Sequence, residues 1–443
     1  MLRTRLAATV TAVALFAAAG CGTDNAGTPA GGSGAVRLYG TDGNMSNSLG
    51  VSLEDRPGVL AGMTGTAPLA PLTEDFKARL RAVQPGLENF NYAGQSYDAV
   101  VVAALAAETG RSTASRDIAR YLPGVTTGGT ECTTVAECFD LVRKGKDIQY
   151  RGQSLRLGGF TDAGEPATAT YGTLHFGRNN KIEDGMTEYV GAGNEADTTT
   201  AAQPAPAPLD QAPKGGPLRI GGLLPKTGQL ASMHPPLVGG AKLGAKEVND
   251  AGGVLDEDVV WIDGDDGTNP DVAKATVERL LAAEVQVIIG AGASGVSKAV
   301  IPRVTGAGVL MISPSATSDE LSTIPDNDLF FRTAAPDLLQ SKALADIVLR
   351  AGSRKVFVVA RDDTWGQGLL KNLKANLESA GIPAGNIAMF IYQPGASAED
   401  KPDVATLAGL VKAFGPDGLV IIGFDESAYV IDALAAGDVT LHE

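Results

Sequence analysis

The sequence of 443 residues is short of positive charge, aromatic side chains, histidine and cysteine. It has 36 Lys and Arg against 51 Asp and Glu. The net charge of −15 argues against a nucleic-acid partner, because phosphate binding needs clustered Lys and Arg. The three histidines, His175, His234 and His442, lie far apart without ligand-like spacing, so no metal site is predicted. The sequence has few aromatic residues and 56 glycines, and this composition favours closely packed α/β layers over a β-sandwich.

Catalytic motifs are lacking as well. The sequence has no G-x-S-x-G elbow, no H-E-x-x-H and no P-loop, so it predicts neither a catalytic set nor a cofactor. The acidic stretch DGDDGTNPD at 263–271 does not have the spacing of an EF-hand, and it predicts a solvated turn from strand to helix.

Apolar runs long enough to cross a bilayer are absent, and the longest one stands at the start, in MLRTRLAATVTAVALFAAAGCG. A basic beginning, a short apolar stretch and small residues directly before Cys21 are typical of a bacterial lipoprotein signal. This pattern predicts cleavage of 1–20, acylation of the Cys21 thiol and a lipid anchor on the outer face of the cell membrane. The alternative is a plain secretory signal in which Cys21 is coincidental, and both readings predict export.

The other two cysteines, Cys132 and Cys138, stand close together in GGTECTTVAECFDL. In an exported chain, a pair this close in a loop is most simply a disulfide.

Two segments have the composition of tethers. Residues 21–35 are rich in Gly, Ser and Thr, and residues 191–216 form a Pro/Ala/Thr-rich linker with a semi-rigid PAPAP core. Two folded stretches remain, 36–190 and 217–443. The second alternates short β-branched runs such as VQVIIGAG and KVFVVARDD with helical patterns, which predicts doubly wound α/β units.

The two ends of the folded chain pose a topological problem. VRLYGTDGN at 36–44 reads as a buried parallel strand, yet no helix precedes it to bring the chain from a neighbouring strand. The helix predicted at 426–437 has no strand after it. The helix at 426–437 can supply the missing connection to the strand at 36–41 if residue 443 lies next to residue 36. The strand at 36–41 would then pair beside GLVIIGF or its neighbour.

GAGASG at 290–295 matches the G-x-G-x-x-G fingerprint of dinucleotide binding. That fingerprint also needs an acidic residue about twenty positions on to hold the ribose, and VLMISPSAT stands there instead. A dehydrogenase is therefore disfavoured. The motif serves equally well as a cradle of backbone N–H groups for a carboxylate at a helix N-terminus.

Read as 217–443 followed by 36–190, the sequence resembles substrate-binding proteins for branched-chain amino acid uptake by ABC importers. The match is to the leucine/isoleucine/valine-binding type with a type I periplasmic-binding fold. The motifs that carry the resemblance include IGGLLPKTGQLA, EVNDAGGVL, MISPSAT, LFFRTAAPDLLQS, DDTWGQGL, LYGTDGN and FTDAGEP. Segments that normally close such a chain open this one, so the order is that of a circular permutant or of a gene-assembly artefact.

The resemblance implies an α/β fold of two doubly wound lobes, joined by a hinge of three crossovers near 65, 160 and 336. First-lobe segments are expected at 66–159 and 217–336, and second-lobe segments at 36–65, 160–190 and 337–443.

The resemblance also implies a ligand site in the cleft between the lobes. Ala293 and Ser294 would bind an α-carboxylate, and Asp42 would pair with the ligand ammonium. The remaining implied residues are Ser315 and Thr317 as further polar contacts, Ala316 between them, and Trp365, Phe424 and Met233 as walls. From the residues alone, Asp42 also suits a turn, Thr317 a helix cap near Asp319, and the wall residues ordinary core packing.

The implied function is that of a monomeric, non-enzymatic receptor that delivers a small amino acid to permease and ATPase subunits made as separate chains. The alternative is a sensor for a related amide, short peptide or aromatic acid. Neighbouring genes for a permease and an ATPase would favour import.

Overall fold

The computed structural model describes residues 35–395 and 400–441. The predicted signal peptide, Cys21 and nearly all of the 21–35 tether therefore lie outside the described residues. Among the helices in the described ranges, none combines the length and the apolar character that crossing a bilayer requires.

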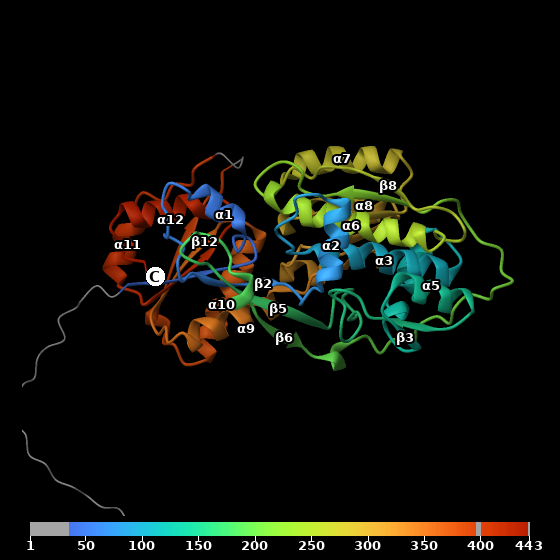
Figure 1. Cartoon of the computed structure of the whole chain (residues 1–443), viewed down its shortest axis with the longest axis horizontal. Helices are drawn as coiled ribbons and strands as arrows, with labels where there is room; N and C mark the ends of the chain where they lie inside the picture. Colours follow the sequence, from blue (N-terminus) through green and yellow to red (C-terminus); the bar gives the residue numbers. More distant parts are fainter. Residues whose placement is uncertain (1–34, 396–399, 442–443) are drawn as a thin grey trace, which may run out of the picture. The chain divides into compact units, whose positions relative to one another are not determined.

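Strands and helices alternate along most of the chain (Figure 1). The α-helices are α1 Asn47–Ser52, α2 Glu74–Val83, α3 Ala93–Gly110, α4 Ser115–Tyr121, α5 Val135–Arg143, α6 His234–Asp250, α7 Pro270–Ala282, α8 Ser294–Gly306, α9 Asp337–Arg350, α10 Thr364–Ser379, α11 Leu407–Phe414 and α12 Ser427–Ala436. Short 3₁₀ helices are η1 Gly124–Thr126, η2 Asp184–Met186, η3 Glu195–Asp197, η4 Ala231–Met233, η5 Asp319–Thr323 and η6 Ala384–Asn386.

A seven-stranded sheet has the order β13-β12-β14-β1-β2-β5-β6. Its strands are β1 Arg37–Gly40, β2 Thr64–Pro68, β5 Thr168–His175, β6 Glu188–Gly193, β12 Val356–Arg361, β13 Ile387–Tyr392 and β14 Gly418–Ile422. The pairs from β13 to β2 are parallel, whereas β5 and β6 are added antiparallel to their neighbours.

Helices cover both faces of this sheet, and the alternation of side chains along β12 shows how. Val356 and Val358 pack in one core with residues of α9 and α10, while Phe357 and Val359 pack in another with residues of α11 and α12. Successive side chains of a strand point to opposite faces, so a continuous apolar run is what a strand buried on both faces needs.

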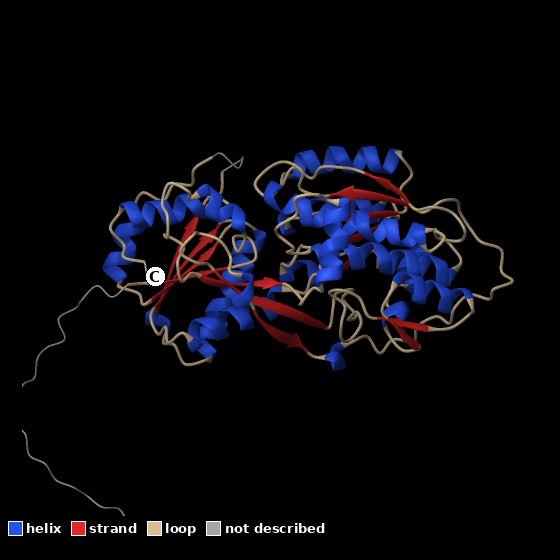
Figure 2. Cartoon of the chain, in the orientation of Figure 1, coloured by secondary structure: helices blue, strands red, loops and turns tan. Residues whose placement is uncertain are grey.

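A second sheet is entirely parallel and has the order β11-β10-β9-β7-β8. Its strands are β7 Arg219–Leu223, β8 Val260–Ile262, β9 Val287–Gly290, β10 Leu310–Ser313 and β11 Phe330–Arg332. Ile289 and Ile312 face α3 and α6, and Ile288 and Met311 face α7 and α8. Figure 2 shows the helices around these strands. The predicted α/β class with parallel sheets is confirmed.

Helix α3 is the centre of the core on this sheet. All 18 of its residues are buried, which matches its continuous apolar run from Ala99 to Ala107. A helix that is hydrophobic all round must be enclosed, and α3 packs against α6, α4, α5 and the sheet.

The predicted disulfide is confirmed. Cys132 and Cys138 are bonded, with their Cα atoms 5.4 Å apart. The bond ties β3 (Thr130–Cys132), which pairs with β4 (Ile148–Tyr150), to the helix α5.

Strand β1 lies inside the seven-stranded sheet, between β14 and β2. Arg37 is in register with Gly418, and the Val36 N–H donates to the Thr440 carbonyl at 2.8 Å. The predicted pairing of the strand at 36–41 beside GLVIIGF is confirmed. Its backbone groups thereby find partners that an isolated strand would lack.

The linker predicted at 191–216 begins inside β6, which ends at Gly193. Beyond it, the backbone N–H of Ala207 donates to the Thr109 carbonyl and that of Lys214 to the Arg111 carbonyl. The segment therefore lies against the end of α3. Its prolines have no N–H, which keeps such backbone contacts few.

Candidate functional site

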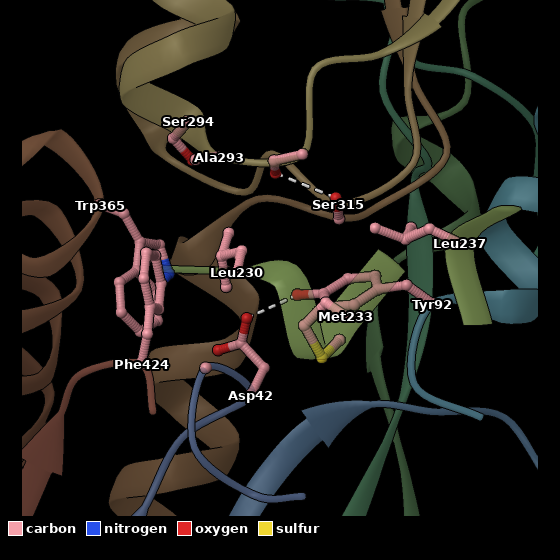
Figure 3. Close-up of a pocket in the computed structure, with 12 residues that line it drawn as sticks. Asp42, Tyr92, Leu230, Met233, Leu237, Ala293, Ser294, Ser315, Trp365 and Phe424 are labelled. Atoms are coloured by element: carbon pink, nitrogen blue, oxygen red, sulfur yellow. Dashed lines mark hydrogen bonds between the residues drawn. The ribbon is translucent and has the colours of Figure 1, made fainter. Parts of the chain in front are cut away.

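A cavity lies where strands of both sheets end (Figure 3). Its lining residues are Asp42, Gly43, Tyr92, Leu230, Met233, Leu237, Gly292, Ala293, Ser294, Ser315, Trp365 and Phe424. Carboxyl ends of parallel strands are the usual place for ligands in open α/β sheets. Seven of the nine predicted ligand-binding residues line the cavity, namely Asp42, Met233, Ala293, Ser294, Ser315, Trp365 and Phe424.

One side of the cavity is the N-terminus of α8, the helix that follows β9. Ala293 is its N-cap residue and Ser294 its first residue. The Ser294 hydroxyl oxygen accepts hydrogen bonds from the backbone N–H groups of Thr317 and Ser318, both at 3.1 Å. With both lone pairs engaged, this hydroxyl has only its hydrogen left to offer the cavity. Donors and the positive end of the helix dipole make this side suited to a carboxylate.

Asp266 supports the same side from behind. It is fully buried, one carboxyl oxygen accepts from the Gly292 N–H at 2.7 Å, and the other accepts from the Thr268 N–H at 2.7 Å. Burial raises the pKa of Asp266 to about 7, against the opposing effect of these two bonds. The prediction that 263–271 is a wholly solvated turn is therefore wrong at Asp266. The pattern of four acids and two glycines cannot show which carboxylate turns inward.

The opposite side carries Asp42, two residues beyond the end of β1. Its side chain is 6% exposed. The Tyr92 hydroxyl donates to one carboxylate oxygen and the Gln340 amide to the other, both at 2.6 Å. Burial raises the pKa of Asp42, and the two hydrogen bonds oppose that rise. Asp42 thus offers the cavity a fixed acceptor.

Two stacked aromatic rings form a wall. The rings of Trp365 and Phe424 lie 5.0 Å apart, centroid to centroid, with 26° between their planes. Gly43 lies against them, since a Cβ there would come within 2.8 Å of both rings and 2.6 Å of the Gly423 carbonyl. Any side chain at position 43 would push the wall aside.

Behind the wall, Arg361 is almost completely buried at the end of β12. Its guanidinium carbon lies 3.6 Å from the centroid of the Phe424 ring. It donates to Glu426 at 2.8 Å, to Asp363 at 2.6 Å and to Gln229 at 2.7 Å. Although burial opposes it, the carboxylates of Glu426 and Asp363 hold the pKa of Arg361 above its usual value.

Gln229 lies in the loop between β7, a strand of the five-stranded sheet, and η4. Besides accepting from Arg361, it donates to the Gly395 carbonyl at 2.6 Å. This one side chain therefore joins the loop after β7 to both β12 and the loop after β13.

Ala316 and Thr317 do not line the cavity. Both side chains are buried behind Ser315, where the Ala316 carbonyl accepts from Arg332 at 3.2 Å and the Thr317 carbonyl accepts from the Asp337 N–H at 2.8 Å. The residue that caps η5 is Ser318, not Thr317. Alternation along SPSAT cannot be read from sequence, because the segment is an irregular turn and not a strand.

Five lining residues were not predicted, namely Gly43, Tyr92, Leu230, Leu237 and Gly292. Gly292 lay within the GAGASG motif, and Leu230 in GQLA next to Met233, so their motifs offered a signal. Tyr92 and Leu237 come from two helix starts far apart in the sequence, and only the fold shows that they meet.

Comparison with known proteins gives a family match over residues 217–442, described as periplasmic binding protein. A Leu/Ile/Val-binding protein homolog 3 of Brucella melitensis is 30% identical over 166 residues, which are 37% of this chain and 45% of that protein. The leucine-, isoleucine-, valine-, threonine- and alanine-binding protein of Pseudomonas aeruginosa is 30% identical over 190 residues, 43% of this chain and 49% of that one.

Among solved structures, a branched-chain amino acid transporter substrate-binding protein of Streptococcus pneumoniae in complex with isoleucine matches with a TM-score of 0.44. It is 23% identical, and the match covers 51% of this chain and 62% of that one. The chain spans about half the length of the curated relatives it matches.

The matched region 217–442 is just over half of the chain, and it contains the whole five-stranded sheet and the strands β12, β13 and β14 of the seven-stranded sheet. The predicted resemblance is thereby confirmed at the level of the family, which is one of binding proteins and not of enzymes. The chain belongs to the periplasmic binding protein family.

Proposed function

We propose that this protein binds a small amino acid with free α-carboxylate and α-ammonium groups in the cavity between its two sheets. The observation that supports this most is that hydrogen-bond donors line one side of the cavity and a hydrogen-bond acceptor lines the other. The α8 N-terminus and the Ser294 hydroxyl offer donors, Asp42 offers an acceptor, and apolar and aromatic side chains lie between them.

The amino acid is branched-chain or otherwise small and hydrophobic. Leu230, Met233 and Leu237 supply an apolar lining opposite the aromatic wall. The relatives from Brucella and Pseudomonas are named for binding leucine, isoleucine and valine, which agrees with such a lining.

The role is that of the substrate-binding component of an ABC importer, with permease and ATPase as separate chains. The export signal places the chain outside the cytoplasm, and acylation of Cys21 anchors it to the membrane. Replacing Cys21 with Ser should move the protein from the membrane fraction to the soluble one. An unchanged fractionation would refute the anchor.

The chain is a circular permutant of the family order, with the lobes at the boundaries predicted above. In support, β1 lies between β14 and β2, and β5 and β6 extend the same sheet. The first lobe would then be built on the five-stranded sheet and the second on the seven-stranded sheet.

A thermal-shift screen against the twenty amino acids tests the function, since a ligand that binds only the folded state raises its stability. Calorimetry with Asp42→Ala follows. Truncating one partner of a buried charge pair costs about 2–5 kcal/mol, so affinity should fall by about thirtyfold or more. Binding of the amino acid by this variant with unchanged affinity would remove Asp42 from the site, and a screen without any hit would refute the function.

A further inference from the structure

Tyr92 has an unusual backbone for a large side chain. It is the residue before α3, and its φ of 62° and ψ of 2° place it in the left-handed region. A bulky residue with positive φ is rare, and such strain persists where the surrounding structure holds it, often at a binding site. The side chain is 3% exposed, and its ring lines the cavity.

The Tyr92 hydroxyl connects a helix on the five-stranded sheet to a residue of the seven-stranded sheet. α3 is packed on the five-stranded sheet, whereas Asp42 follows a strand of the seven-stranded sheet. The hydrogen bond from Tyr92 to Asp42 is 2.6 Å long, and Figure 3 shows it on the floor of the cavity, facing Ser315. The other Asp42 oxygen is held by Gln340, at the start of α9. Both oxygens are thus fixed in direction.

We propose that Tyr92 is a positioning residue, which holds the Asp42 carboxylate for an α-ammonium group and thereby selects amino acids over the corresponding carboxylic acids. The inference rests on the proposed function and adds to it the residue that sets this selectivity.

The chemistry of the two donors supports it. A phenol and an amide are neutral, so they orient the carboxylate without cancelling its charge. A buried carboxylate still needs a cation, and an ammonium on the ligand supplies one. A ligand without that ammonium leaves the charge unpaired, which is a penalty against the wrong ligand.

The charged and titratable groups around Asp42 reinforce the demand for a cation. Tyr92 faces it from the start of α3, and Asp337 on α9 and Tyr171 on β5 lie within electrostatic reach. Arg332, on β11, acts on Asp337 and Tyr171, and its guanidinium is hydrogen-bonded to Glu165. Burial raises the pKa of Asp337 well above its usual value, so this neighbouring carboxyl favours its neutral form and supplies no cation to Asp42.

The test is Tyr92→Phe, which keeps the ring in the cavity lining and removes only the hydroxyl donor. Calorimetry compares L-leucine with 4-methylpentanoate, the same acid without its amino group. A hydrogen bond to a charged group is worth a factor of about ten to a hundred, so the preference for L-leucine should shrink about tenfold or more.

A pH profile separates positioning from simple packing. Loss of the Tyr92 donor raises the pKa of Asp42 further, so L-leucine binding should be lost at a higher pH on acidification than in the wild type. The matched control is Tyr97→Phe on the same helix. The Tyr97 hydroxyl also donates to a carboxylate, that of Glu247 at 2.5 Å, but Tyr97 does not line the cavity. This control should keep both the preference and the pH midpoint.

An unchanged preference and midpoint in Tyr92→Phe would overturn the inference while leaving the proposed function intact. A wild-type protein that binds none of the twenty amino acids would instead refute the function. If Tyr92→Phe does not fold, site-specific difluorotyrosine at position 92 replaces it. Its more acidic hydroxyl is a stronger donor and should lower the pH midpoint, and an unmoved midpoint would overturn the inference equally.

Discussion

Replacing Arg361 with Ala should destabilise the protein far more than the loss of an ordinary ion pair. Arg361 and Glu426 are 4% and 2% exposed, and the same Glu426 oxygen also accepts from the Tyr392 hydroxyl at 2.8 Å and the Phe424 N–H at 3.1 Å. Removing one partner of a buried pair leaves the other charge uncompensated. We expect the free energy of unfolding to fall by about 3–5 kcal/mol.

The chain offers a matched control in Arg303, which binds both oxygens of Glu278 at 2.6 and 2.7 Å but is half-exposed. Water screens that pair, so Arg303→Ala should lower the free energy of unfolding far less than Arg361→Ala. Both variants remove an arginine from a carboxylate partner, and the pair is buried in one case and exposed to water in the other.

Urea unfolding followed by tryptophan fluorescence measures both variants. The chain has two tryptophans, Trp261 and Trp365, and Trp365 stacks on the ring that Arg361 covers. In a Trp261→Phe background, the remaining fluorescence therefore reports on this cluster. The double variant Arg361→Met with Glu426→Gln should recover part of the loss, because a neutral amide still accepts from Tyr392 without needing a cation. Equal costs for Arg361→Ala and Arg303→Ala would refute the reasoning.

Three further predictions concern other parts of the molecule. The disulfide closes a short loop, so replacing Cys132 and Cys138 with Ser should lower the free energy of unfolding by about 2 kcal/mol, and alkylation without reduction should leave both unmodified in the wild type. Between about pH 4 and pH 7, folded Asp266 holds a proton that the unfolded chain has lost, so stability should fall as the pH rises; Asp266→Asn should flatten this slope in urea titrations, and a wild type without it would contradict the raised pKa. Cleavage at a protease site inserted near the PAPAP segment should leave two fragments that elute together, since β1 is paired with β14, and separation without denaturant would exclude that pairing in solution.

The fold was largely predictable because its strands are short, continuous and apolar, and buried parallel strands need that pattern. The position of β1 was predictable because the sequence before residue 36 does not have the pattern of a crossover helix. Asp42, Ser294 and Phe424, which line the cavity, were implied by the family resemblance, and each lies within a few residues of the end of a strand. Sequence reasoning failed where orientation depends on an irregular turn, as at Thr317, or where a contact joins distant segments, as between Tyr92 and Asp42.

The place of β1 in the middle of its sheet also constrains the order of folding. Leu38 and Tyr39 pair with Leu419 and Val420, which come far later in the sequence. During synthesis, β1 must wait without this neighbour until residues 418–422 have been made, whereas the five-stranded sheet joins segments that lie closer together in sequence. We therefore expect the five-stranded sheet to form early and the seven-stranded sheet to close last. A long-lived exposed strand is prone to wrong pairing, so this topology makes the last step of folding the one at greatest risk of aggregation.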